Sequence, residues 1–468
     1  MVPYFPRRIA ERAIVIYLIS LALVSVFFYR YLMLPGYIVL GVVWVSAFFL
    51  LTNKFSMEWR RVSEKEYLRR LFLVAVGIRL VWVVASYFYY IDATGRPFEF
   101  EAADAMGYHE EATWAAGASW FEVWDAYFGS GAHGVSDVGY PLYLSLIYRI
   151  FGPVIIIPRI IKAFISAYTC ILLYRVTSRI VNDDMGRLAG IICALIPNLV
   201  IYCGYHLKET EMIFLEVLFL ERTDHMLRSE KLKFWDVLFP SLLALSLFFF
   251  RTVLGAAAGF AMATAVLLSN APAMKKGLRR ASLVGWGILA VLVFGGGTIM
   301  TEVEGYWEER DDNVAKKRYE QTVRGNQWAQ YATGTVMAPM MFVLPFSTMV
   351  NVDGQYAQQT KHSGNYVRNF MGFFAILAFY EAIRRKKWRD LALPGVFVLT
   401  YLSIVAVSGF SNSERFLLPG MPLLIFFWTY GIATLRPQTF KYFAPWTYVV
   451  ILMEVAWAYF KLGSRGLF

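Results

Sequence analysis

The sequence predicts an all-α, polytopic membrane protein, and three observations lead to this fold class. Of the 468 residues, 58% are hydrophobic and only 17% are charged, a balance that soluble domains do not show. Many apolar stretches run for about 17 to 25 residues, the length that a helix needs to cross about 30 Å of hydrocarbon. These stretches are continuous rather than alternating, which favours helices over a membrane barrel.

The net charge of +11 follows the membrane topology, because the basic residues cluster between the apolar stretches. The sequence has no zinc-finger spacing and no basic helix with interleaved aromatic residues, so we expect no nucleic-acid partner. Its three cysteines, Cys170, Cys193 and Cys203, lie in apolar stretches without metal-ligand spacing.

Residues 1–53 are expected to form an N-terminal transmembrane hairpin. Arg7, Arg8 and Arg12 place the N-terminus in the cytoplasm, ahead of spans near 14–33 and 37–53. The first apolar stretch is too long for the core of a signal peptide and lacks a small-residue cleavage site. We therefore expect a retained anchor.

Residues 54–300 are expected to form a membrane core with an outer loop at 92–140. The loop at 54–70 has six basic and three acidic residues and so belongs to the cytoplasm, and a span at 71–91 then leads outward. The outer loop has nine acidic residues and one basic residue. Asp104, Tyr108 and Glu111 follow i, i+4, i+7 spacing, which predicts a helix at the membrane surface.

The remaining elements alternate across the membrane. An apolar piece at 142–151 is too short to cross, because ten helical residues cover roughly 15 Å. Residues 301–369 are expected to be an outer cap and loop region, with a non-crossing piece at 337–350 and a polar loop at 351–369. Residues 370–468 are expected to hold the C-terminal spans, the first of which ends in the basic segment 384–389. The total is about 13 spans, completed by 155–180, 186–205, 209–227, 236–251, 252–270, 281–300, 370–384, 391–410, 415–434 and 443–461.

Asp104, with Tyr108 and His109, is the first candidate group for chemistry. A carboxylate beside the membrane can act as a general base toward a hydroxyl group, although a solvated loop acid is the alternative for any single residue. The segment from His109 to Thr113 lacks a second histidine four residues on, which excludes the helix of a zinc protease.

His206, Lys208 and Glu209 form the second group, and arginines form the third. His206 and Glu209 have the i, i+3 spacing of one helix face, and ionisable groups beside a bilayer are candidates for function. The alternative is an interfacial lysine beside a structural pair. Arginines inside spans or at their ends can bind a phosphate through two parallel hydrogen bonds, or merely anchor a helix. They are Arg79, which lies inside a span, Arg159, Arg251 and Arg415.

With these residues in place, the chain resembles the GT-C superfamily of glycosyltransferases, in the branch that uses polyprenyl-phosphate sugars and includes protein O-mannosyltransferases and the aminoarabinose transferase of lipid A. The resemblance covers about residues 70–270 and is weaker at Glu414-Arg415-Phe416-Leu417-Leu418-Pro419. Its motifs are the span with Arg79, Asp104-x-x-x-Tyr108, Gly139-Tyr140-Pro141-Leu142-Tyr143, Phe151-Gly152, Pro158-Arg159-Ile160, Tyr174-Arg175, Ile196-Pro197, Glu209 and Arg251-Thr252.

The resemblance implies transfer of a sugar, with inversion, from a polyprenyl-phosphate donor to a hydroxyl of a lipid, glycan or protein acceptor. Asp104 would be the general base, Glu209 the second acidic residue, and Arg251 or Lys208 would neutralise the leaving phosphate. The reaction would occur on the outer face of the membrane, expected to be a bacterial inner membrane. We expect Tyr108, His109, His206, Arg159 and Arg415 to contribute to substrate binding. A divalent cation is compatible with this chemistry but is not required, because cations of the protein can stabilise the phosphate.

The chain departs from the pattern of its relatives in places, and two other functions compete. Two spans precede the family-like core, no large soluble C-terminal domain is expected, and Glu209 stands where relatives have aspartate. A polysaccharide polymerase or ligase of the other GT-C architecture would use a late outer loop, here 351–369 with Lys361, His362 and Arg368. A transporter or flippase would show paired repeats with broken helices, and the sequence shows no internal repeat.

Overall fold

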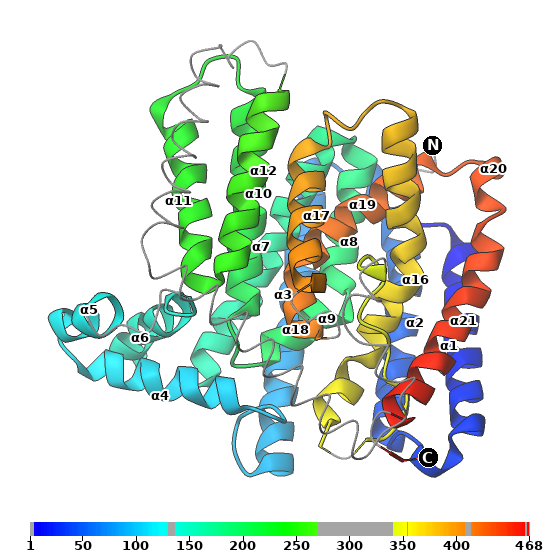
Figure 1. The fold of residues 1–468 in the computed structure, drawn as a ribbon, viewed down its shortest axis with the longest axis horizontal. Helices are drawn as coiled ribbons and strands as arrows, with labels where there is room; N and C mark the ends of the chain where they lie inside the picture. Colours follow the sequence, from blue (N-terminus) through cyan, green and yellow to red (C-terminus); the bar gives the residue numbers. More distant parts are fainter. Residues whose placement is uncertain are drawn as a thin grey trace.

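The computed structural model describes residues 4–129, 136–269, 340–352, 354–407, 413–463 and 466–467. Within these ranges the regular structure is helical, apart from one isolated bridge between Leu32 and Val350. The prediction of an all-α fold is therefore confirmed. Figure 1 shows a bundle of upright helices from which one arm, built by α4, α5 and α6, projects sideways near one end.

The N-terminal helices are α1 (Arg7–Phe27), α2 (Pro35–Glu58) and α3 (Glu64–Thr94). The first helix begins and ends about six residues earlier than the sequence predicted, because residues 29–31 form a separate short turn. The hydroxyl of Ser63 accepts a hydrogen bond from the Glu66 amide and caps the start of α3. Gly95 ends this helix with a φ of 74°, which suits glycine.

The arm consists of α4 (Ala103–Gly117), α5 (Trp120–Phe128) and α6 (Gly139–Phe151). A capping box between Ser119 and Glu122 starts α5. Large aromatic side chains of the arm, among them Trp120 and Trp124, are exposed. Residues 103–117 and 120–128 of the predicted outer loop are helical, which agrees with the helix predicted around Asp104. Helix α6 has 13 residues, which agrees with a piece too short to cross.

The centre of the bundle contains a broken helix. Helix α7 (Ile156–Ile180) is continuous, but α8 (Asp183–Leu195) and α9 (Pro197–Ile201) meet at a bend of 53°. The predicted span at 186–205 corresponds to this bent pair, and the crossing of the pair as one span stays a prediction. Pro197 has no amide hydrogen for the helical ladder, and the side chain of Arg79 instead donates to the carbonyl groups of Cys193 and Ala194.

On the side of the bundle that carries the arm lie α10 (Glu209–Arg228), α11 (Phe234–Phe250) and α12 (Thr252–Leu268). The predicted span at 281–300 and the predicted charged cap at 301–335 lie outside the described residues. Of the predicted non-crossing piece at 337–350, residues 340–350 are described, and they form turns rather than a long helix.

The C-terminal part contains α16 (Tyr356–Arg384), α17 (Ala392–Val407) and α18 (Glu414–Leu417), followed by α19 (Met421–Thr434), α20 (Pro437–Phe440) and α21 (Phe443–Gly463). The prediction of a loop at 351–369 is wrong, because α16 begins at Tyr356. Its first half is polar but buried, and its side chains find partners inside the bundle: His362 lies 2.8 Å from the Tyr17 hydroxyl, and Gln359 donates to Asn351.

The lengths and compositions of the helices indicate a multi-pass integral membrane protein. Within the part of the chain that the structure describes, six helices are long and apolar enough to cross a membrane, and a seventh span results if the bent pair α8–α9 crosses as one. Three further apolar helices are shorter: Phe234–Phe250, Thr252–Leu268 and Ala392–Ala406. The count of 13 spans stays a prediction.

Candidate functional site

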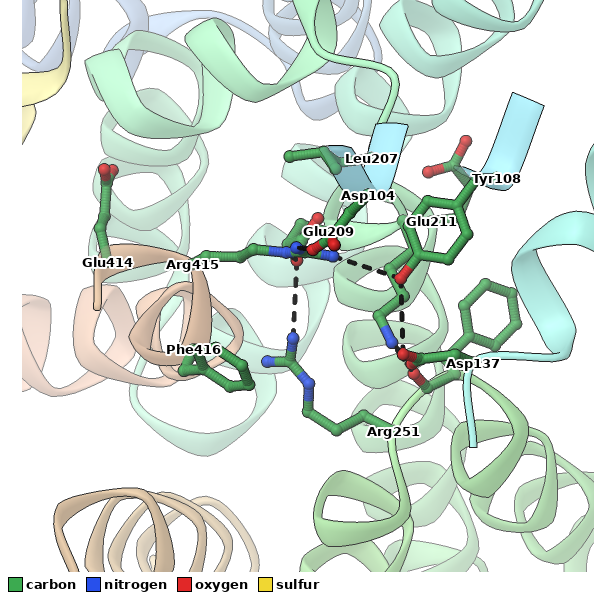
Figure 2. Close-up of polar contacts among 12 residues, drawn as sticks. Asp104, Tyr108, Asp137, Leu207, Glu209, Glu211, Arg251, Glu414, Arg415 and Phe416 are labelled. Atoms are coloured by element: carbon green, nitrogen blue, oxygen red, sulfur yellow. Dashed lines mark hydrogen bonds and ion pairs between the residues drawn. The ribbon is translucent and has the colours of Figure 1, made fainter. Parts of the chain in front are cut away.

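Arg415 is the centre of the candidate site (Figure 2). Its Nη1 atom contacts the Asp104 carboxylate, its Nε atom donates to Glu209 Oε1 over 2.5 Å, and its Nη2 atom donates to the Tyr108 hydroxyl over 3.3 Å. Asp104 and Glu209, far apart in sequence, thus contact one guanidinium group. The side chain of Glu209 is fully buried, whereas that of Asp104 is 60% exposed.

Each of these side chains stands at the start of a helix. Asp104 lies in the first turn of α4 and Glu209 in the first turn of α10, where a negative charge stabilises the helix. Arg415 belongs to the short helix α18. Its neighbour Glu414 is held by Asn198 of α9 and by Lys361 of α16, whose Nζ atom lies 3.3 Å from Glu414 Oε2. The broken helix therefore helps to position Arg415.

Arg251 is the second cation of the site, and it occupies the junction between α11 and α12. It lies 3.5 Å from Glu209 Oε1 and donates to the Tyr401 hydroxyl over 3.1 Å. Its guanidinium also stacks over the ring of Phe416 at 4.5 Å. Glu209 therefore lies between two arginines, as Figure 2 shows.

Lys208 is the third cation, and its partner is Asp137, which the sequence analysis did not select. The buried Lys208 forms an ion pair with Asp137 and donates to the carbonyl of Phe250. Asp137 has a φ of 72°, an uncommon conformation in which aspartate is enriched. The Tyr108 hydroxyl donates to Asp137 over 3.5 Å and thereby links the Lys208 pair to Arg415. Burial raises the pKa of Tyr108 to about 12, so this hydroxyl stays protonated at neutral pH.

His206 and Glu209 do not share a helix face, because α10 begins only at Glu209. His206 instead turns toward the arm, where its Nε2 atom lies 3.2 Å from the Tyr148 hydroxyl. The same hydroxyl lies 2.8 Å from His109 Nδ1, so the two histidines are joined through one tyrosine. Burial lowers the pKa of both histidines, that of His206 well below its usual value.

Arg159, predicted to bind substrate, contacts residues outside the cluster around Arg415. It is fully buried, lies 3.6 Å from Glu99 and donates to the carbonyl of Pro97. Glu99 also accepts a hydrogen bond from the amide of His206. Through these contacts Arg159 stabilises the loop at 97–99, which in turn holds the backbone of His206.

The site balances three cations against three carboxylates. Arg251, Arg415 and Lys208 face Asp104, Glu209 and Asp137, and two of these acids come from the arm or from the segment that precedes α6. Such a cluster can bind an anion when an acid withdraws, and it can hold a base next to that anion. Among the described residues, no group of three or more His, Cys, Asp or Glu side chains is placed to hold a metal ion.

Several residues of the site were missed because their signals are weak in the sequence. Asp137 is one of nine acids in the loop, marked only by its position just before Gly139-Tyr140-Pro141. Asn198 and Tyr401 are single polar residues within apolar stretches. Glu414 had the clearest signal, since it directly precedes Arg415.

The chain matches no protein-family model, and no curated protein matches it.

Proposed function

We propose that this integral membrane protein is a GT-C-like glycosyltransferase that moves a sugar from a polyprenyl-phosphate donor to an acceptor hydroxyl on the outer face of a bacterial inner membrane. The observation that carries the proposal is the contact of Arg415 with both Asp104 and Glu209. This contact brings a half-exposed carboxylate of the arm next to a buried group of cations. Acid/base chemistry on a substrate with a phosphate needs both components in reach of one another.

The proposed reaction is a single displacement. Asp104 accepts the proton of the acceptor hydroxyl while its oxygen forms a bond to the anomeric carbon. The bond between that carbon and the phosphate oxygen breaks on the opposite side, which inverts the configuration. The electron pair leaves with the polyprenyl phosphate, whose added charge Arg251, Arg415 and Lys208 stabilise.

The position of the arm supports an outward site. In Figure 1 the arm lies near one end of the bundle, and the turn between α16 and α17 lies at the other end. That turn contains the basic segment 384–389, which the positive-inside rule assigns to the cytoplasm. Asp104 then faces the outer side, where lipid-linked sugars meet envelope acceptors.

The test is a transfer assay with purified protein and a panel of polyprenyl-phosphate sugars. We expect Asp104→Asn to lower the rate by about 10²- to 10⁴-fold, the range for loss of a general base. Glu110→Gln is the matched control, because it removes one negative charge from an exposed position of the same helix, and it should leave the rate unchanged. Equal turnover by Asp104→Asn and wild type would remove Asp104 from the role of base.

One observation favours a second candidate, a transporter or flippase. The bend between α8 and α9 and the buried Asn198 beside it resemble the broken helices at which transporters bind their substrates. Liposomes that contain the protein, a labelled polyprenyl-phosphate sugar and lipid and glycan acceptors with free hydroxyl groups separate the two functions. Movement of the label between leaflets without any glycosidic product would support the transporter and contradict the transferase.

The polymerase or ligase alternative rests on Lys361, His362 and Arg368 in a late outer loop. In the structure these residues lie in the buried first half of α16. His362 contacts Tyr17, and Arg368 donates to the carbonyl of Leu417, so both have partners within the bundle. Lys361 and Arg368 contact helix α18, which carries Arg415, and Lys361 does so through Glu414.

A further inference from the structure

The two edges of the Arg415 guanidinium group face different environments. The Nε atom contacts Glu209, which is fully buried. The Nη1 and Nη2 atoms form the edge that suits two parallel hydrogen bonds to a phosphate, and they contact Asp104 and Tyr108 of α4. The inner contact therefore fixes the orientation of the guanidinium, and groups of the arm cover the edge that a ligand would use.

We propose that Asp104 is a built-in competitor, which occupies the phosphate-binding edge of Arg415 until a phosphate group replaces it. The replacement exchanges one ion pair for another. The guanidinium releases one carboxylate oxygen of Asp104 and takes up oxygens of the phosphate, and no bond between heavy atoms forms or breaks. The ligand class is a phosphate ester whose negative charge is not already paired with a cation.

The exposure of each partner indicates which contact yields. The Asp104 side chain is 60% exposed, so water can solvate its carboxylate when the ion pair opens, and exposure of a partner weakens an ion pair. Glu209 is fully buried and also lies 3.5 Å from Arg251. Removal of a cation from a buried carboxylate costs far more than removal from an exposed one. A phosphate therefore displaces Asp104 and leaves the contact between Arg415 and Glu209 intact.

Lys208 shows the same arrangement on the other side of Tyr108. Its buried ammonium group contacts Asp137, whose side chain is 51% exposed. Two cations of the site, Arg415 and Lys208, are thus paired with the half-exposed carboxylates of Asp104 and Asp137. The pattern indicates that these acids shield the cations when the site holds no anion.

Competition also sets the order of events, and this step rests on the proposed function. While the Asp104 carboxylate contacts Arg415, it is oriented toward the guanidinium group and not toward an acceptor hydroxyl. Binding of the donor phosphate to Arg415 releases Asp104, which can then accept a proton from the acceptor. The donor would therefore bind first, and the base would become available only when the donor is present.

The test is equilibrium binding to the full-length protein in lipid nanodiscs, which needs no turnover. The ligands are a short-chain prenyl monophosphate, inorganic phosphate and the uncharged prenyl alcohol. We expect Asp104→Asn and Asp104→Ser to bind the prenyl phosphate about two- to fivefold more tightly than wild type, the gain that corresponds to loss of an exposed ion pair. Glu110→Gln should bind like wild type, and Arg415→Gln should bind at least tenfold more weakly.

The three ligands distinguish the sources of the phosphate. Tighter binding of both phosphates by the Asp104 variants supports competition for the phosphate group itself, and tighter binding of prenyl phosphate alone supports a site that also requires the lipid. Unchanged or weaker binding by both variants, with melting temperatures close to that of wild type, would overturn the proposal. If the variants bind more tightly but no donor is turned over, the competition stands and the proposed transferase activity fails.

Discussion

The arrangement around Arg415 explains why arginine stands at this position. Its three nitrogens point to three different groups, Glu209, Asp104 and Tyr108, and lysine has no planar fork with which to reach all three. Glu209 depends most on this contact, because it is buried and its Oε2 atom has no hydrogen-bond partner among the described residues.

The Arg415–Glu209 pair can therefore be tested by a double-mutant cycle. Arg415→Gln should lower the free energy of unfolding by about 1 to 3 kcal/mol, because Glu209 keeps only the longer contact with Arg251. Additional replacement of Glu209 by glutamine should recover part of this loss, since position 209 then carries no charge, and only part because the buried Arg251 loses its ion-pair partner. Chemical denaturation in detergent measures all four proteins. Strictly additive effects would show that the two residues do not interact.

The histidines joined by Tyr148 predict how stability depends on pH. Burial lowers the pKa of His109 and His206, so the unfolded chain binds protons near pH 6.5 that the folded chain does not bind. The free energy of unfolding is therefore not reduced by these histidines above about pH 6.5, and it falls as the pH drops below this value. We expect His206→Gln to flatten the fall in melting temperature between about pH 7 and 5. The exposed His225→Gln is the control and should keep the wild-type slope.

Sequence reasoning selected Asp104, Glu209 and Arg415 separately, by charge beside apolar stretches, and the structure brings them together. It could not foresee that Arg159 pairs with Glu99 whereas Arg415 pairs with Asp104 and Glu209, because both arginines follow the same pattern of a cation at the end of a span. It assigned His206 and Glu209 to one helix face because it placed the start of the helix too early. Side-chain partners across the bundle depend on tertiary packing, which periodicity does not contain.

At the scale of the element, the broken helix α8–α9 shows how a buried arginine can be structural. Arg79 is fully buried, and its guanidinium donates to Ser166 and to the carbonyl groups of Cys193 and Ala194. A backbone break inside a membrane needs such partners, because no water is present to satisfy the carbonyl groups. The resemblance to GT-C enzymes begins at the span with Arg79. The contacts of Arg79, however, indicate that this residue stabilises the broken helix.

We therefore expect Arg79→Met to destabilise the protein without a specific effect on ligand affinity. Two carbonyl groups would lose a charged donor, which should lower the free energy of unfolding by about 3 kcal/mol. Arg69→Met, at a position where the side chain is 73% exposed, should change it little. Thermal unfolding in detergent provides the measurement. A melting temperature for Arg79→Met that equals that of the Arg69→Met control would contradict the capping role.

The boundaries of helices were predictable where the apolar stretches are uniform, and not where polar residues are buried. The apolar stretch at 155–180 corresponds closely to α7 (Ile156–Ile180). The first half of α16 looks like a loop in the sequence because it contains Gln359, His362 and Arg368, but tertiary partners satisfy these groups inside the bundle. Burial of polar side chains with partners overrides the rule that polar segments lie outside.

At the scale of the whole molecule, the structure fixes which ends of the helices lie together. The N-terminus and the α16–α17 turn lie near one end of the bundle in Figure 1, and the arm and the C-terminus lie near the other. Composition and apolar stretches were sufficient to predict a helical membrane protein. They could not place the arm against α10 and α18, since that contact joins segments about 100 and 300 residues apart.

Cysteine labelling in intact cells tests this topology. The native cysteines, Cys170, Cys193 and Cys203, are all buried, so they should react little. A membrane-impermeant maleimide should label Glu110→Cys on the arm in intact cells. It should label Lys387→Cys in the α16–α17 turn only after the membrane has been permeabilised. Labelling of both variants in intact cells would contradict the placement of the arm and the basic turn on opposite sides.

The sideways arm has a practical consequence for anyone who extracts the protein. Four large rings on α4 and α5, Trp114, Trp120, Phe121 and Trp124, are each about half or more exposed. Tryptophan favours the boundary between lipid headgroups and acyl chains, so native phospholipid is the natural covering of these rings. A small, highly curved micelle can cover the helix bundle, but it does not cover the arm that projects from the bundle. Preparations that retain a patch of bilayer should therefore keep the arm, and Asp104 with it, in place better than short-chain detergents do.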